Sequence, residues 1–179
     1  MGLRHSFYRA LFALAPGESC SIDEIAEKLG VLPSTAKRYL KELVKLGYVT
    51  EVFEGRFSLT ETGELLQKSV LSHLKSHKDL SPYFFTDPST SQPVPLSIKN
   101  LKQLYALLKY DVIEWKILEH HVKAGYLSKW IREAIGDIEL ANKIDEARNS
   151  IDKDKLMKII EERLKIIDSI KGLQVSEKI

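Results

Sequence analysis

The chain has 179 residues, of which 44% are hydrophobic and 29% are charged. This composition is typical of a folded globular protein and excludes a disordered or fibrous one, and the length allows one ordinary domain or two small ones. The net charge of +2 is too small to indicate a nucleic-acid ligand by itself, so such a function requires a local cluster of basic residues.

The residue composition also indicates the cellular location of the protein and the type of organism it comes from. Cys20 is the single cysteine, so an internal disulfide and a cysteine-based zinc site are excluded. No apolar run approaches the roughly 20 residues of a membrane span, and we expect a cytoplasmic protein without a membrane partner. Lysine and glutamate are abundant while asparagine and glutamine are scarce, a balance that resembles thermophile proteins.

Three helices are predicted in the first 47 residues. Apolar residues recur at helical spacing over 3–14. The second helix begins at Ser21, which forms an S-x-x-E capping box with Glu24. The third helix, residues 33–46, begins at Pro33 and stops before a glycine.

A β-hairpin and another helix follow. Residues 48–60 are rich in β-branched and aromatic side chains on both sides of Glu54-Gly55, a pair that favours a tight turn. Apolar residues between 62 and 77 again recur at helical spacing. The order helix, helix, helix, hairpin is that of a winged helix, which is a variant of the helix-turn-helix.

The helix at 33–46 has an apolar and a basic face. Lys37, Lys41 and Lys45 are four residues apart and form a stripe on the side opposite Leu40 and Leu43. The sequence "SIDEIAEKLGVLPSTAKRYLKELVKLGYVTEVFEGRFSLTETG" resembles the DNA-binding part of MarR- and ArsR-like and related archaeal winged-helix regulators, over residues 5–75.

This resemblance implies a DNA-binding site on the third helix. In such folds the first half of that helix faces the major groove, and the hairpin forms a wing against the DNA backbone or minor groove. The residues expected to neutralise phosphates are Lys37, Arg38, Lys41, Lys45 and Arg56. Those expected to reach base edges are Ser34, Thr35 and Arg38.

Two alternatives to DNA binding stay open. A helix rich in lysine can simply face water, and Glu51 and Glu54 make the wing less basic than that of a strong DNA binder. Winged helices also serve as protein–protein modules in replication, transcription and sorting complexes. Weak dependence of binding on salt would favour such a module.

The second half of the chain starts with a proline-rich segment. Residues 79–96 are interpreted as an ordered linker, because Tyr83, Phe84 and Phe85 indicate packing rather than a free chain. Residues 97–179 are then predicted to form a helical domain for dimerisation, partner binding or effector binding. Either 152–173 or 62–77 is the candidate dimer interface; the last helix can instead pack on its own domain.

Residues 82–144 resemble a little-characterised helical domain of archaeal and bacterial proteins, for which no activity is implied. The positions that carry this resemblance are Phe85, Asp87, Pro88, His121, Gly125, Trp130, Ile131, Gly136, Asp137, Leu140 and Ala141. His120 and His121 are adjacent on a helix and point about 100° apart, so a packed or half-exposed pair is favoured over a metal site. We expect no metal, no cofactor and no enzymatic activity, since no catalytic motif is present.

The sequence therefore predicts a mostly α protein with a small β-hairpin wing. A winged-helix DNA-binding domain occupies residues 1–78, the linker 79–96 and the helical domain 97–179. The predicted function is a double-stranded DNA-binding transcriptional regulator, as a homodimer, with helix 33–46 in the major groove and hairpin 48–60 as the wing. The alternative is a winged-helix assembly module.

Overall fold

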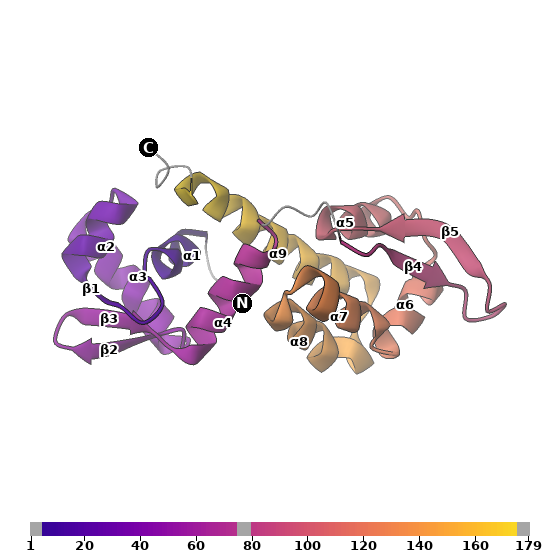
Figure 1. The fold of residues 1–179 in the computed structure, drawn as a ribbon, viewed down its shortest axis with the longest axis horizontal. Helices are drawn as coiled ribbons and strands as arrows, with labels where there is room; N and C mark the ends of the chain where they lie inside the picture. Colours follow the sequence, from indigo (N-terminus) through magenta and orange to yellow (C-terminus); the bar gives the residue numbers. More distant parts are fainter. Residues whose placement is uncertain (1–4, 75–79, 175–179) are drawn as a thin grey trace. The chain divides into compact units, whose positions relative to one another are not determined.

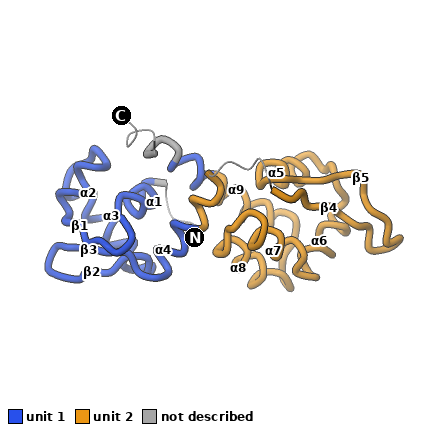
Figure 2. The backbone as a smooth tube through the Cα atoms, viewed as in Figure 1, with its two compact units in different colours: residues 1–68, 165–179 blue, residues 69–164 orange. Residues whose placement is uncertain are grey.

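The structure, a computed structural model, describes residues 5–74 and 80–174 and contains two compact units (Figures 1 and 2). One unit comprises residues 1–68 and 165–179, and the other residues 69–164. The division falls inside α4 (Glu61–Ser72) and inside α9 (Lys153–Gln174). Over the two described ranges, no helix has the length and apolar character that a membrane crossing requires.

The first unit is a winged helix (Figure 1). Besides the start of α4 and the end of α9, its elements are α1 (His5–Phe12), β1 (Ser19–Ser21), α2 (Ile22–Leu29), α3 (Pro33–Lys45), β2 (Val49–Phe53) and β3 (Arg56–Leu59). The strands form an antiparallel sheet in the order β1-β3-β2. The three-residue β1 was not predicted, and the predicted helix positions 3–4 and 75–77 lie outside the described residues.

Local sequence signals define the ends of these helices as predicted. The Ser21 amide donates to Glu24 Oε2 at 2.6 Å, and the Glu24 amide donates to Ser21 Oγ at 3.2 Å, which is the predicted capping box. Gly30 ends α2 and Gly47 follows α3, both in the left-handed region, with φ of 64° and 76°. The mostly α fold class with a small wing is confirmed.

The core of the winged helix lies between its helices and one face of the sheet. Leu11, Ile25, Leu40 and Leu43 are all fully buried. The buried Gln67 side chain of α4 donates to two main-chain carbonyls at the end of the first helical segment, at 2.8 and 2.9 Å. This bond pair joins α4 to the end of the first helical segment and supplies a side-chain donor to the carbonyls of Leu11 and Leu14, the first of which also accepts from the Leu14 amide at 3.3 Å.

The second unit contains a β-hairpin and a group of helices. Besides the end of α4 and the start of α9, its elements are β4 (Tyr83–Thr86), β5 (Pro93–Ile98), α5 (Leu101–Lys109), α6 (Trp115–Lys123), α7 (Tyr126–Trp130), a π-helical turn (Ile131–Ile135), α8 (Ile138–Ala147) and a 3-10 turn (Arg148–Ser150). The hairpin begins within the segment 79–96 and extends beyond it to Ile98. Residues 80–96 of the predicted ordered linker therefore lie in this unit.

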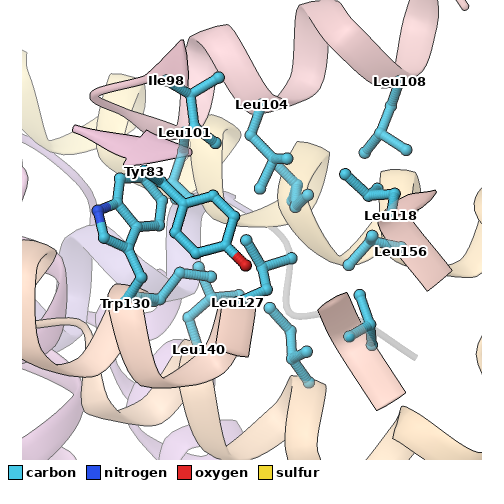
Figure 3. Close-up of a cluster of buried hydrophobic side chains, with 14 of the residues drawn as sticks. Tyr83, Ile98, Leu101, Leu104, Leu108, Leu118, Leu127, Trp130, Leu140 and Leu156 are labelled. Atoms are coloured by element: carbon cyan, nitrogen blue, oxygen red, sulfur yellow. The ribbon is translucent and has the colours of Figure 1, made fainter. Parts of the chain in front are cut away.

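Alternation of side chains along β4 explains why the hairpin is packed. Tyr83 and Phe85 face the core, at 8% and 0% exposure, while Phe84 and Thr86 face outward. Tyr83 packs against Trp130 with ring centroids 5.4 Å apart, amid the leucines of α5 to α9 shown in Figure 3. Pro93 and Pro95 are tolerated in β5 because this strand pairs on one side only, with β4.

A cluster of charged side chains is buried beside the start of α8. The Asp137 carboxylate caps this helix by accepting from the Leu140 amide at 2.9 Å. Its Oδ2 lies 2.7 Å from His73 Nε2 and 3.2 Å from Arg163 Nε. Arg163 also pairs with Glu139, and its side chain is 2% exposed. These pairings allow an otherwise costly set of charges to be buried.

Candidate nucleic-acid interface

The helix α3 is held by its buried face. Pro33 occupies the first helical turn, where a missing amide hydrogen is tolerated. Ala36, Leu40 and Leu43 are fully buried, and α3 packs against α1, α2 and β2. The opposite side of α3 is thereby directed outward on a rigid element of the domain.

The outward side of α3 carries the predicted basic residues. Ser34, Lys37, Arg38, Lys41 and Lys45 are exposed, and Thr35 is partly buried. The guanidinium of Arg38 lies 5.5 Å from the ring centroid of Tyr39, which itself packs edge-on against Phe7 at 5.3 Å. Lys45 lies 3.8 Å from Glu42, so the carboxylate offsets part of the charge at the end of the stripe.

The N-terminus of α3 adds to this basic surface. The residue before the helix, Leu32, has a hydrocarbon side chain and cannot accept a hydrogen bond from the first-turn amides. Its carbonyl accepts from Thr35 and Ala36 at 2.9 and 3.1 Å. A helix start without a side-chain acceptor presents partial positive charge, which suits a phosphate group.

Arg56 is directed differently from the residues on α3. Its Nε donates to Ser19 Oγ at 3.1 Å, and its Nη2 donates to the Ser19 carbonyl at 2.6 Å. The same Nη2 lies 3.8 Å from the Glu24 carboxylate. The structure thus brings six of the seven predicted residues together on α3 and ties the seventh to β1 and α2.

The tip of the wing is apolar and acidic. The chain turns at Glu54-Gly55, as predicted, with Gly55 at a φ of 75° and Glu51 accepting from its amide at 2.9 Å. Phe53 is 73% exposed and Val52 is 45% exposed. The exposure of Phe53 could not be predicted from the sequence, because the register of β2 shifts between Glu51 and Phe53 and breaks the regular alternation of side chains.

The histidine pair of the second unit divides into a packed and an exposed residue. His121 is buried, with Nδ1 2.5 Å from the Tyr83 hydroxyl and Nε2 3.0 Å from the Thr86 amide nitrogen. His120 is exposed and contacts the Tyr126 ring at 6.2 Å. The predicted packing role is confirmed for His121, and within the described ranges no group of three or more His, Cys, Asp or Glu could hold a metal ion.

Comparison with known proteins supports the assignment of the first unit. Residues 2–56 match the family model described as MarR family. The match covers less than a third of the chain. For this part it supports, in general terms, a DNA-binding transcription regulator with a winged helix-turn-helix. It confirms the predicted resemblance there, whereas the archaeal type and the resemblance of residues 82–144 stay predictions. Neither the search of the curated proteins nor the search of the solved structures found a match.

Proposed function

We propose that the chain is a transcriptional regulator that binds double-stranded DNA with α3 in the major groove. The observation that carries the proposal is the row of exposed cations on α3, Lys37, Lys41 and Lys45, in a domain whose sequence matches the MarR family. The buried face of α3 fixes the helix in the domain, so its cations form a regular row that can contact a DNA duplex. Such a pattern binds phosphates and releases counterions.

The residues of α3 take different roles in this proposal. Lys37, Arg38, Lys41 and Lys45 neutralise phosphates. Ser34, Thr35 and Arg38 lie in the first half of the helix, from which base edges are read. Stacking of Arg38 on Tyr39 limits the side-chain freedom that would be lost on binding, which favours Arg38 as the main base contact.

Arg56 is better suited to positioning the wing than to binding a phosphate. Its guanidinium is already hydrogen-bonded to Ser19 and paired with Glu24, so a contact with DNA would require these interactions to break. By joining the start of β3 to β1, it supports the strand from which the wing extends. We therefore expect its replacement to reduce affinity less than replacement of a cation on α3.

A homodimer would place two copies of α3 on a palindromic site and raise affinity by linking the two binding events. There are two candidate interfaces. One is residues 152–173, which form most of α9, and the other is the helix predicted at 62–77, of which α4 is the described part. Analytical ultracentrifugation at micromolar concentration tests this point. A monomer that still binds DNA would remove dimerisation from the proposal and leave the DNA contact in place.

A protein–protein assembly module is the second candidate function. The observation that favours it is the exposure of several large apolar side chains in the winged helix, among them Leu32 at 71%, Phe53 at 73% and Leu46 at 48%. A protein partner would cover these side chains and would not require the lysines of α3.

Fluorescence anisotropy with labelled duplex DNA distinguishes the two candidates. Neutralisation of four phosphates predicts a fall in affinity of about two orders of magnitude between about 50 and 200 mM salt. The double variant Lys37→Ala/Arg38→Ala should lose most of this binding. The control Lys109→Ala/Lys129→Ala removes two exposed cations from helices of the second unit, outside both candidate dimer interfaces, and should bind like the unmodified chain. Equal binding by both double variants would refute the groove assignment.

A further inference from the structure

The second unit contains a cavity of about 540 Å³ between the β4–β5 hairpin and the helices α6 and α7. Its volume lies in the range of small-molecule sites, about 300–1,000 Å³. The lining residues from the hairpin are Tyr83, Phe84, Thr86, Asp87, Pro88 and Ser91, and those from the helices are His120, His121 and Tyr126. All of them belong to the second unit, so the cavity includes no residue of α3.

The floor of the cavity is a fixed polar layer. Both ring nitrogens of His121 lie within hydrogen-bond distance of Tyr83 or Thr86, at 2.5 to 3.1 Å. The same imidazole packs against Phe85 and Tyr83 with ring centroids 5.5 Å apart in each case. Burial lowers the pKa of His121, so its ring is neutral at pH 7 and adds no positive charge to the cavity.

The rim of the cavity is aromatic and open to solvent. Phe84 is 63% exposed and Tyr126 is 54% exposed, although both are large side chains. Phe84 comes from the hairpin and Tyr126 from the start of α7, so the rings belong to two different elements. Faces of aromatic rings attract both flat apolar groups and organic cations.

One carboxylate, that of Asp87, lies among the lining residues. The turn that follows β4 fixes Asp87: its Oδ1 accepts from the Ser89 amide at 2.8 Å, and its carbonyl accepts from the Ser91 amide at 2.8 Å. The Ser89 hydrogen bond lowers the pKa of Asp87, so the group is ionised at neutral pH. Lys116 acts in the same direction, but its ammonium is bonded to Glu114 at 3.0 Å and is not part of the lining.

We propose that this cavity is a binding site for a small organic cation, with the ammonium group at Asp87 and the apolar body against Phe84 and Tyr126. A carboxylate beside exposed aromatic faces is the arrangement that recognises an amine. An anion is disfavoured because the lining residues include no lysine or arginine. A neutral ligand of the same shape would gain the aromatic contacts but not the attraction of Asp87.

Isothermal titration of the full chain tests this site with three probes of similar shape. The probes are phenethylamine, 2-phenylethanol and 3-phenylpropionate, which carry a positive, a neutral and a negative group, each titrated to about 10 mM. We expect phenethylamine to bind at about millimolar concentration and each of the others to bind at least about fivefold more weakly.

Two variants and a control locate the binding. Asp87→Asn removes the charge while its side-chain oxygen can still accept from Ser89, and Phe84→Ala removes one ring of the rim. Each should weaken phenethylamine about fivefold or more, whereas Glu146→Gln, which removes a carboxylate from α8 outside the lining, should not change it. Absence of phenethylamine binding, equal binding of the alcohol, or equal binding by Asp87→Asn would each overturn the proposal.

Discussion

Replacing Asp137 by asparagine removes a buried charge and leaves the shape of the side chain almost unchanged. The side chain is 0% exposed and lies between His73 and Arg163. Asparagine is as good a helix cap as aspartate, so the bond from the Leu140 amide is expected to survive. The substitution therefore tests the charge of Asp137 rather than its role as a cap.

The expected cost depends on the partners that remain after the substitution. Arg163 is 2% exposed and would keep Glu139 as its acidic partner but lose the Asp137 carboxylate. Breaking a buried ion pair by removing one partner costs about 3–5 kcal/mol, and the remaining pair places the present case at the lower end, about 3 kcal/mol. For a chain of this length that is a fall in melting temperature of about 6–12 °C.

Urea unfolding followed by circular dichroism measures the change, with Asp152→Asn as the matched control. Asp152 accepts from the Lys155 amide at 2.8 Å at the start of α9, so it has the same capping bond in an exposed place. Its substitution should change the free energy of unfolding by less than about 0.5 kcal/mol. If Asp137→Asn cost no more than the control, the buried charges would not stabilise the unit and the reasoning would be wrong.

Three further substitutions probe other parts of the molecule. Lys41→Ala should make the log–log slope of DNA affinity against salt less steep by about 0.9 without altering thermal stability, and an unchanged slope would place this lysine off the DNA. Burial lowers the pKa of His121 below its ordinary 6.5, so as pH falls below about 6.5 the unfolded chain takes up the proton first and native stability declines. His121→Asn should reduce the decline in the urea midpoint between about pH 7.5 and 5.5, and an equal decline would contradict this account. Gly63→Ala should lower the free energy of unfolding by about 2 kcal/mol although alanine favours helices, because the added Cβ would lie 2.0 Å from the Tyr48 carbonyl oxygen. The control Thr62→Ala, on the exposed side of the same turn, should leave the free energy of unfolding nearly unchanged. A Gly63→Ala variant more stable than the unmodified chain would refute the steric argument.

The winged helix could be predicted because its determinants are local. The capping box at Ser21 and Glu24 and the glycines at 30 and 47 act within one helical turn of the ends they define. The spacing of Lys37, Lys41 and Lys45 on one exposed side of α3 is likewise a property of the helix alone. Such features are readable in a sequence without knowledge of what the helix packs against.

The direction of Arg56 could not be predicted, because it depends on a distant partner. Ser19 lies 37 residues earlier, in a strand too short to give an alternating pattern. Pairing of Ser21 with Arg56 in the sheet brings the two segments together. A position after the turn of a hairpin suggested a free cation, and only the register of β1 against β3 shows that the guanidinium has partners within the domain.

The cavity of the second unit illustrates the same limit and why it arises. Asp87 and Phe84 lie about 40 residues before Tyr126 in the chain, and no spacing within the sequence predicts that the three line one cavity. What brings them together is the register of β4, in which Tyr83 and Phe85 turn toward His121 and Phe84 turns outward. A shift of one residue would bury Phe84 and expose both inner rings. Of the positions behind the resemblance of this region, Phe85 and His121 therefore form the floor and Asp87 supplies the carboxylate, while the two aromatic residues of the rim, Phe84 and Tyr126, lie outside that pattern.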